Sequence, residues 1–420
     1  MVVGGGGREH AIIKKLKENK NIDTLYAVPG NGGMKDDAVL VPIGAKDLDA
    51  ICDFAVKNAI DFAVVAPDDP LVLGLVDRLN EVGIECFGPT KNAAIIEGSK
   101  AFSKNLMKKY GIPTAEYANF TDVKKALAYL DSKSAPIVIK ADGLALGKGV
   151  IIAQTIEEAK QAVIEMMENG KFGASGNTVV IEEFLTGPEV SVLAFTDGNV
   201  VVPMVSSMDH KRAKDNDEGL NTGGMGTIAP NPYYTKDIDA ICMETIFKPT
   251  IDAMNKEGRT FKGCLYFGLM LTQNGPKVIE YNCRFGDPET QVVLPLMESD
   301  LFTVMQKTAR GTLTEKDVKF SNKSACCIIM ASNGYPEEYE KGFEIIQKEK
   351  IDGDVFVAGA KLENDKLLTN GGRVLGVTTI GDTLKDAINK GYKEINKITF
   401  EKAFYRHDIG ARALKAKENN

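Results

Sequence analysis

The stretch that decides the fold is Lys277-Val-Ile-Glu-Tyr-Asn-Cys-Arg-Phe-Gly-Asp-Pro-Glu-Thr-Gln291. Its first residues are expected to form a β-strand, so Glu280 and Asn282 share one face of that strand. A carboxylate beside an amide oxygen suits Mg²⁺, which prefers hard oxygen ligands together with nucleotide phosphates. Arg284 extends this face if the strand continues, which would bring its guanidinium near a phosphate or a carboxylate. Because a charged face buried without a ligand is costly, the stretch predicts a magnesium–nucleotide site rather than a solvated strand face.

A glycine-rich loop from Lys140 to Val150 gives a second signal for a nucleotide. A lysine at the end of a strand can meet a phosphate, and glycines allow backbone N–H groups to close over phosphate oxygens. A Walker A loop is excluded, because the G-x-x-x-G-K spacing is one residue short and Gly149 replaces the Ser or Thr that would hold magnesium. We expect phosphate contacts from Lys140, Gly143, Gly147 and Lys148, with an ordinary surface turn as the alternative.

The run Glu182-Glu183-Phe184-Leu185 follows a predicted strand over 178–181. A strand that leaves the core into such a hinge offers backbone groups to an adenine base, and Glu189 could accept both ribose hydroxyls. An ordinary strand end is the alternative. A helix expected over 98–110 carries Lys104 away from its apolar face.

The first hundred residues alternate short apolar strands with glycine loops and helices, which predicts a parallel sheet covered on both faces. Strands are expected over 1–3, 25–28, 62–66 and 84–87. The glycines from Gly4 to Gly7 lie between a strand and a helix, where unpaired N–H groups can bind an anion. The spacing is not G-x-G-x-x-G, so a dinucleotide site is not indicated. A tight structural turn is the alternative.

The remaining elements are predicted from turns, caps and apolar runs. We expect hairpins that join 191–195 to 200–205 and 264–272 to 277–282, and a helix capped by Thr121. Beyond a connection over 295–323, strands are expected over 325–331, 355–361 and 373–380, with a helix over 383–398. Two polar clusters, Asp209–Arg212 and Asn221–Gly226, bracket a loop that either shapes a site or is a flexible surface loop.

Composition excludes several classes of protein. The 420 residues suffice for two to four domains, and a net charge of −7 without a basic cluster argues against nucleic-acid binding. None of the seven cysteines forms a C-x-x-C pair, and the three histidines have no zinc spacing. No apolar run is long enough to span a membrane, and no signal peptide is visible. We therefore expect a cytoplasmic protein, and by default a monomer.

Several segments together resemble the phosphoribosylamine–glycine ligase family of the ATP-grasp superfamily. They occur in the family's order and span nearly the whole chain: Gly5-Gly-Gly-Arg-Glu-His10, Pro29-Gly-Asn-Gly-Gly33, Asp209-His-Lys-Arg212, Asn221-Thr-Gly-Gly-Met-Gly226, Arg284-Phe-Gly-Asp-Pro-Glu-Thr-Gln291, Thr369-Asn-Gly-Gly-Arg-Val-Leu-Gly376 and Tyr405-Arg-His-Asp-Ile-Gly-Ala-Arg-Ala-Leu414. The resemblance implies an α/β ATP-grasp fold. Its expected parts are an N-terminal parallel-sheet domain (1–98), an ATP-grasp domain (99–295) with a small mobile lid (about 120–187), a connection (296–323) and a mixed C-terminal domain (324–420).

The resemblance also implies an activity: ATP, glycine and 5-phosphoribosylamine would give glycinamide ribonucleotide, ADP and phosphate, through glycyl phosphate, in the second step of purine biosynthesis. Mg²⁺, or Mn²⁺, would be held by Glu280 and Asn282. The catalytic residues would be Arg284, Asp287 and Lys140. ATP would be bound by Lys104, Lys140, Gly143, Gly147, Lys148, Glu182, Glu183, Leu185 and Glu189. The other substrates would be bound by Gly6, Gly7, Asn31, Gly32, Asp209, Lys211, Arg212, Asn221, Thr222, Gly223 and Gly224.

Two departures from the family pattern and three alternatives stay open at this point. Few residues precede the first glycine loop, and the predicted strand over 264–272 contains no acid, so a second metal ion would rely on Glu280, Asn282, phosphates and water. The alternatives are another ATP-grasp ligase with a different carboxylate and amine, a nicotinamide-dependent oxidoreductase, and a nucleotide-sensing module without turnover.

Overall fold

The computed structural model describes residues 1–144, 149–169 and 173–418. Its N-terminal sheet is parallel throughout, as the sequence predicts, with the strand order β3-β2-β1-β4-β5. The strands are β1 (Val2–Gly4), β2 (Tyr26–Pro29), β3 (Val39–Leu40), β4 (Phe62–Val65) and β5 (Glu85–Phe87). The edge strand β3 was not predicted, because it has only two residues and Val39 is half exposed.

Helices cover both faces of this sheet. Side chains of one face pack with α1 (Gly7–Leu16) and with α12 (Leu301–Arg310), a helix inside the predicted connection. The other face packs with α2 (Leu48–Lys57), α3 (Asp68–Leu73), α4 (Leu75–Glu81) and α5 (Lys91–Gly98). The helix expected over 98–110 is α6 (Lys100–Tyr110), and it starts later than predicted. Ser99 is extended between α5 and α6, and its hydroxyl accepts from the N–H of Phe102 at 3.0 Å, which caps α6.

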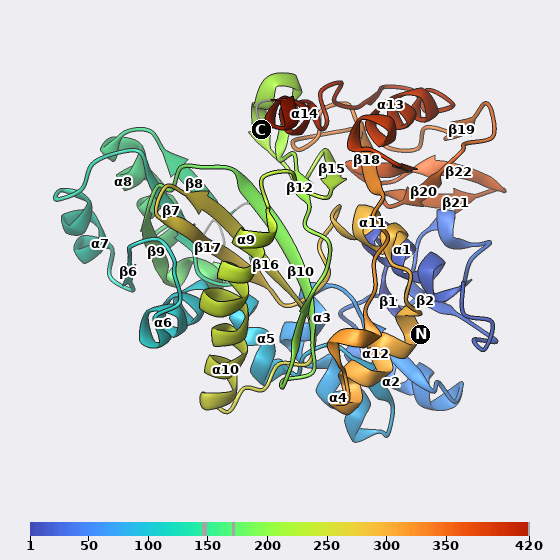
Figure 1. Ribbon diagram of the computed structural model, residues 1–420, viewed down its shortest axis with the longest axis horizontal. Coiled ribbons are helices and arrows are strands. Elements are labelled where there is room, and N and C mark those ends of the chain that lie inside the picture. Colours follow the sequence, from blue (N-terminus) through green and yellow to red (C-terminus); the bar gives the residue numbers. More distant parts are fainter. Residues whose placement is uncertain (145–148, 170–172, 419–420) are drawn as a thin grey trace.

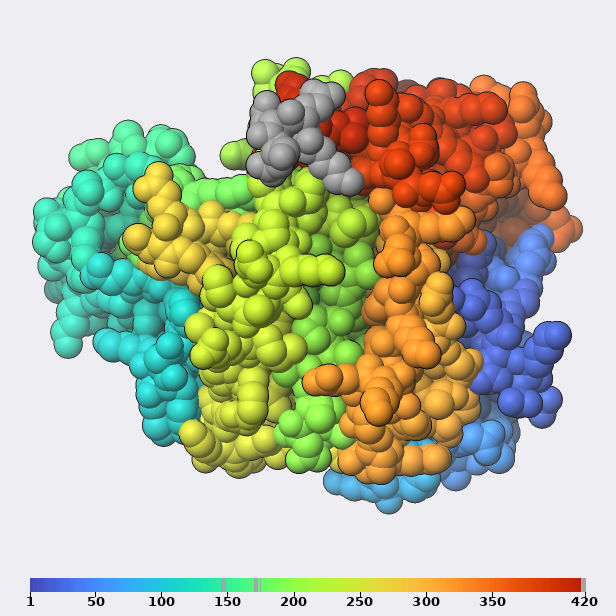
Figure 2. Space-filling model, viewed as in Figure 1, coloured from blue at the N-terminus to red at the C-terminus, as the bar shows by residue number. Residues whose placement is uncertain are grey.

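A small antiparallel sheet with its own hydrophobic cluster forms the lobe at the left of Figures 1 and 2. Its strand order is β6 (Tyr117–Phe120), β9 (Val179–Glu183), β7 (Ile137–Ala141) and β8 (Val150–Ala153). Two helices, α7 (Val123–Leu130) and α8 (Ile156–Met167), pack on it. The predicted cap Thr121 is wrong by one residue: Asp122 caps α7 by accepting from the N–H of Lys125.

The central sheet consists of the two predicted hairpins side by side. Its order is β11 (Val201–Pro203), β10 (Glu189–Thr196), β16 (Gly263–Thr272) and β17 (Gly275–Asn282), all antiparallel. Helix α10 (Lys248–Lys256) belongs to the same hydrophobic core as β16 and β17. Strand β17 ends at Asn282, so the condition under which Arg284 would extend the face of Glu280 and Asn282 is not met.

The C-terminal sheet takes two strands from the middle of the chain. Its order is β12 (Met208–Asp209), β15 (Gly226–Ala229), β18 (Ser324–Ser332), β23 (Arg373–Gly381) and β20 (Asp354–Val357), with β25 (Ala403–Phe404) also beside β18. Helix α13 (Leu384–Ile395) packs on it (Figure 1). The polar loop between β12 and β15 is therefore anchored at both ends to a sheet built mostly from the last hundred residues.

Two C-terminal predictions need correction. The strand expected over 355–361 is split into β20 and β21 (Ala360–Glu363), because the chain turns at Gly359, which packs closely against Gly371 and Arg373. The helix expected to reach residue 398 ends at Ile395, and Ile398 lies in β24 (Ile398–Thr399). The remaining elements are β13 (Arg212–Lys214), β14 (Glu218–Asn221), β19 (Ile346–Gln347), β22 (Lys366–Thr369), α9 (Lys236–Cys242), α11 (Thr290–Val293) and α14 (Ala411–Glu418). No helix within the described ranges is long and apolar enough to cross a membrane.

Candidate active site

A buried carboxylate between two lysines lies where the small sheet meets the central sheet. Glu182, 3% exposed at the end of β9, pairs with Lys104 at 2.9 Å and with Lys140 at 3.0 Å. Lys104 also donates to the hydroxyl of Thr114 at 2.8 Å, and Lys140 donates to the carbonyl of Ile279 at 3.1 Å. Burial lowers the pKa of Lys104 to about 8, although Glu182 opposes this shift. Three of the side chains predicted to bind ATP, those of Lys104, Lys140 and Glu182, are thus in contact with one another.

The residues after Glu182 leave the core as predicted. Glu183 faces the other way, is largely exposed and pairs with Lys277 at 2.8 Å. Leu185 is half-buried, and Phe184 and Glu189 are exposed. No side-chain hydrogen bond or ion pair engages Glu189 within the described part of the chain, so its carboxylate is available to a ligand.

The carboxylate of Glu280 is surrounded by cations. Burial raises its pKa, but nearby Lys211, Lys140 and Lys100 outweigh this effect and keep the pKa below its ordinary value. Among the described residues, none forms a hydrogen bond or an ion pair with this carboxylate. Glu280 and Asn282 lie on the same strand, and the oxygen of Asn282 accepts from Arg284 at 3.2 Å. An ionised, unpartnered carboxylate beside an amide oxygen fits a hard divalent cation.

Arg284 remains beside Asn282 although the strand has ended. Its guanidinium pairs with the buried Glu97 at 3.2 Å and donates to the carbonyl of Phe285 at 3.2 Å. The Nε atom of Arg284 is buried and has no hydrogen-bond partner among the described residues. A buried N–H without an acceptor costs free energy, so this atom favours an anionic ligand. Glu97, which also accepts from the N–H of Cys283 at 2.7 Å, was missed by the sequence analysis.

Lys100 is a second cation that the sequence analysis missed. It is the first residue of α6, and its ammonium donates to the carbonyl of Gly143 at 2.7 Å. Burial is the main cause of its lowered pKa, which nearby Glu280 opposes. Lys100 thus faces the glycine loop and Glu280, whereas Lys104, 2% exposed, faces Glu182. Of the predicted phosphate loop, Gly143 has φ +88°, and Gly147 and Lys148 lie outside the described residues.

The N-terminal glycine loop differs from the prediction in one respect. The N–H of Gly6 donates to the carboxylate of Glu9 at 2.6 Å, so Glu9 fills the helix start that was predicted for an anion. Glu9 in turn pairs with the buried Arg8 at 2.6 Å. Glycine is needed here, because a Cβ on Gly7 would lie 2.7 Å from the amide nitrogen of Gln291, and one on Gly6 would lie 3.3 Å from the carboxylate of Asp287.

Asn31 connects this loop to the C-terminal sheet. Its side-chain nitrogen donates to the carbonyl of Gly5 at 2.9 Å and to that of Val357 at 2.8 Å, and its oxygen accepts from Gly33. Gly32 packs against the backbone of Leu362. The donors of the Asn31 amide are therefore used within the protein, and Asn31 shapes the predicted substrate site instead of offering free donors to it.

The polar loop and the Arg284–Gln291 segment meet at Arg373. Its guanidinium donates to the carbonyls of Gly223 at 2.7 Å and Asp287 at 2.9 Å, and pairs with the carboxylate of Asp287 at 3.3 Å. The hydroxyl of Tyr335 accepts from the N–H of Gly223 at 3.0 Å. Neither Arg373 nor Tyr335 was predicted, because both are far from this loop in the sequence.

Within the polar loop, the predicted residues separate into two groups. Asp209 is 3% exposed and pairs with Lys211 at 3.6 Å. Thr222 donates to the carbonyl of Lys211 at 2.8 Å and accepts from the N–H of Gly224 at 2.9 Å, which shapes the turn. By contrast, Arg212 donates to the carbonyl of Gly219, and the exposed Asn221 pairs with Arg212 across the β13–β14 ribbon.

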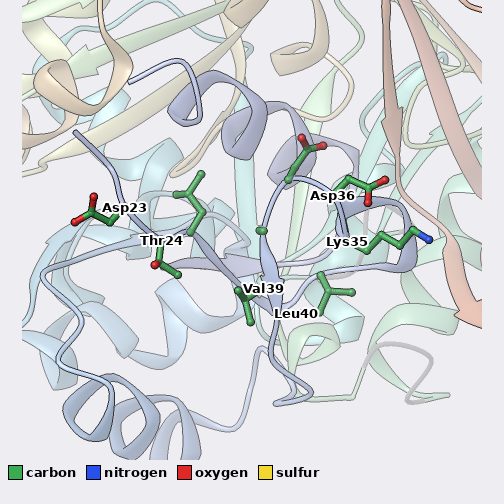
Figure 3. A pocket seen from close by; sticks show the side chains of 9 residues that line it. Asp23, Thr24, Lys35, Asp36, Val39 and Leu40 are labelled. Carbon is green, nitrogen blue, oxygen red and sulfur yellow. The ribbon is translucent and has the colours of Figure 1, made fainter. Parts of the chain in front are cut away.

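An open hollow of about 510 Å³ lies elsewhere, at the exposed edge of the N-terminal sheet (Figure 3). It is lined by Asp23, Thr24, Leu25, Lys35, Asp36, Asp37, Ala38, Val39 and Leu40, none of which was predicted to act. The described residues hold no cluster of three or more His, Cys, Asp and Glu side chains that could form a closed metal cage.

Comparison with known families covers nearly the whole chain. Residues 1–97 match the phosphoribosylglycinamide synthetase N domain, 98–290 its ATP-grasp (A) domain, and 325–412 its C domain. The chain is 48% identical over 415 residues to the phosphoribosylamine–glycine ligase of Fusobacterium nucleatum, covering 98% of this chain and 97% of that protein. It is 47% identical over 427 residues to the enzyme of Escherichia coli O157:H7, covering 100% and 99%.

Solved structures agree with these matches. The phosphoribosylamine–glycine ligase of Thermotoga maritima superposes with a TM-score of 0.87 at 35% identity, covering 97% of this chain and 99% of that chain. A biotin carboxylase from Campylobacter jejuni superposes with a TM-score of 0.75 at 14% identity, covering 96% and 92%, and shares the fold alone. The predicted ATP-grasp fold and the predicted α/β class are confirmed.

Proposed function

This chain belongs to the phosphoribosylamine–glycine ligase family, and on that premise we propose how the residues around Glu280 carry out the family's reaction. The reaction joins glycine to 5-phosphoribosylamine at the expense of ATP and yields glycinamide ribonucleotide, ADP and phosphate, the second step of purine biosynthesis. A nicotinamide-dependent oxidoreductase and a sensor without turnover are therefore excluded.

ATP lies between the small sheet and the central sheet. Its phosphates meet Lys140, Lys100 and the backbone around Gly143, an assignment supported by the position of Lys100 between Gly143 and Glu280. The hinge from Glu182 to Leu185 receives the adenine. The carboxylate of Glu189, which no described side chain engages, receives the ribose. Lys104 acts indirectly in this proposal: it offsets the charge of Glu182 and leaves Lys140 free to turn to a phosphate.

Mg²⁺, which Mn²⁺ could replace, would be held by Glu280 and Asn282 together with the phosphates. The ionised carboxylate of Glu280, which has no partner among the described residues, carries this assignment. When bound, the ion supplies charge neutralisation at the transferring phosphoryl group. The protein adds Lys140 and the half-buried guanidinium of Arg284, whose buried Nε atom has no partner among the described residues and so favours an anionic ligand.

Glycine and phosphoribosylamine bind between Glu280 and the N-terminal glycine loop. A glycine carboxylate oxygen attacks the γ-phosphorus of ATP, the bond from that phosphorus to the bridging oxygen breaks, and ADP leaves, which gives glycyl phosphate. The amine of phosphoribosylamine then attacks the acyl carbon, the C–O bond breaks and phosphate leaves. Asp287 and Arg373 hold the polar loop and the Gly6–Gly7 turn around these substrates. Orienting the reactants in this way can supply roughly 7–11 kcal/mol of the barrier. The proposal includes a monomer as the default state and a cytoplasmic location, where ATP is available.

Replacement of Glu280 by glutamine tests the metal assignment. We expect Glu280→Gln to keep its fold and to bind Mn²⁺–ATP at least tenfold more weakly, as measured by electron paramagnetic resonance of Mn²⁺, with ADP release falling in parallel. Glu298→Gln removes an exposed acid outside the site and is the matched control. Near-normal Mn²⁺ binding by Glu280→Gln would overturn the assignment. ADP release by the unaltered protein that did not require both glycine and phosphoribosylamine would overturn the substrate assignment.

A further inference from the structure

The reaction needs an acceptor for one proton. When the amine nitrogen of phosphoribosylamine bonds to the acyl carbon of glycyl phosphate, the C–O bond to phosphate breaks and the nitrogen loses a proton. None of the cations that surround Glu280 can accept it while charged. His210 is also unsuitable, because its two ring nitrogens already contact the carbonyl of Gly226 at 3.0 Å and the N–H of Gly410 at 3.0 Å.

Asp209 is the acid best placed for this task. It ends β12, and among the described residues only its Oδ1 forms a short hydrogen bond: Oδ1 accepts from the N–H of His210 at 2.7 Å and lies 3.5 Å from the hydroxyl of Thr227. Its Oδ2 contacts Lys211 at 3.6 Å, beyond hydrogen-bond distance. Lys211, which is 41% exposed, covers this oxygen and has room to turn outward.

Asp209 lies between the proposed metal site at Glu280 and the N-terminal glycine loop at Gly6. On one side, Lys211 links it to the metal end, since the charge of Lys211 acts on both Asp209 and Glu280. On the other side is Gly224, where a Cβ would lie 2.5 Å from Oδ1. The carbonyl of Gly224 lies 3.4 Å from Arg373, which pairs with Asp287 next to the Gly6 turn.

The environment of Asp209 suits a base that works near neutral pH. Burial raises the pKa of Asp209 to about 7; Glu289 raises it further, and Lys211 and Arg373 oppose this. The charge of Asp209 also reaches Cys327 and contributes to the raised pKa of its thiol, of which burial is the main cause. A carboxylate with a pKa near the working pH is both largely ionised and basic enough to take a proton.

We propose that Asp209 is the general base that removes the proton from the attacking amine of phosphoribosylamine. The proton passes from the amine nitrogen to Oδ2 of Asp209 as the C–N bond forms, and leaves to the departing phosphate or to water. Asp209 takes no part in forming glycyl phosphate, so this role rests on the proposed function but is separable from it.

Hydroxylamine separates the two half-reactions. It is a small neutral nucleophile that traps glycyl phosphate and does not depend on a base built for phosphoribosylamine. We expect Asp209→Asn to lose at least a hundredfold of the phosphoribosylamine-dependent ADP release and to keep hydroxylamine-dependent ADP release within about threefold. The kcat of the unaltered protein with phosphoribosylamine should rise as the pH passes about 7, where Asp209 loses its proton. Asp209→Glu should restore part of the activity, and Asp382→Asn, an exposed acid, should change neither reaction.

The results with the two nucleophiles distinguish a general base from a residue that only shapes the site. Equal loss with both nucleophiles would mean that Asp209 only shapes the site, and equal retention would mean that it takes no proton; either result overturns the proposal. Absence of ADP release with both nucleophiles in the unaltered protein would instead overturn the proposed function. Because Asp209→Asn removes a buried charge, a thermal midpoint at or above that of the unaltered protein verifies that the variant folds.

Discussion

Replacing Glu182 by glutamine should destabilise the small sheet far more than the same change at Glu183. Glu182 is 3% exposed and balances two lysines that are 2% and 5% exposed. Removing one partner of a buried ion pair costs about 3–5 kcal/mol, because the remaining charge has no compensation. Lys104 keeps Thr114 and Lys140 keeps the carbonyl of Ile279, so we place the loss near the lower end, at about 3 kcal/mol.

The neighbouring Glu183 is a matched control. It has the same chemistry one position along the strand, but it pairs with Lys277 in partly exposed surroundings. Exposed ion pairs contribute about 0.2–1 kcal/mol. The two variants thus differ in burial while sharing side chain, strand and substitution.

Amide hydrogen exchange measures this difference locally, which avoids assuming that the whole chain unfolds in one step. At pH 7, peptides from β7 and β9 should exchange roughly a hundredfold faster in Glu182→Gln and less than about fivefold faster in Glu183→Gln. The difference in exchange rate between the two variants should become smaller as the pH rises through about 8, because Lys104 then loses the proton that gives it the charge balanced by Glu182. A change below tenfold in Glu182→Gln, or equal changes in both variants, would refute the reasoning.

Two further predictions concern the meeting point of the polar loop with Asp287. Gly224→Ala should lower kcat/KM at least tenfold, because Gly224 has φ +116° and a Cβ there would lie 2.5 Å from Asp209. Gly44→Ala is the control, since nothing lies within 4 Å of a Cβ at that position and kcat/KM should not change. Equal kcat/KM values of the two variants would contradict this prediction. Arg373→Lys should raise the KM for phosphoribosylamine about tenfold and leave the KM for ATP unchanged, because a lysine cannot bond to the carbonyls of Gly223 and Asp287 at once. Arg310→Lys, which alters an exposed pair with Glu85, is the control. A parallel rise in both KM values would contradict the assignment.

The parts of the site that could be predicted from sequence are those set by local periodicity. Glu280 and Asn282 share a strand face because side chains alternate along a strand, and this holds despite the bulge between Gly268 and Leu269. The parallel N-terminal sheet and both hairpins follow from apolar runs and turn residues. The place of Arg284 beside Asn282 could not be predicted in this way, because Arg284 lies beyond the end of the strand and pairs there with the distant Glu97.

The parts that could not be predicted depend on packing between distant segments. Lys100 was missed because its position depends on the extended conformation of Ser99, which separates α5 from α6 and makes Lys100 the first residue of α6. Arg373 and Tyr335 reach the polar loop only because β15 and β18 pair in one sheet. The pKa of Asp209 likewise follows from burial, which no spacing along the chain reveals.

The most direct test of the central claim is the fate of glycine's carboxylate oxygens. Glycine labelled with ¹⁸O in its carboxyl group is supplied with Mg²⁺–ATP and freshly made phosphoribosylamine, and the released phosphate is examined by mass spectrometry. If glycyl phosphate is the intermediate, one labelled oxygen moves from glycine to phosphate in each turnover. Unlabelled phosphate, released while glycinamide ribonucleotide still forms, would contradict the account.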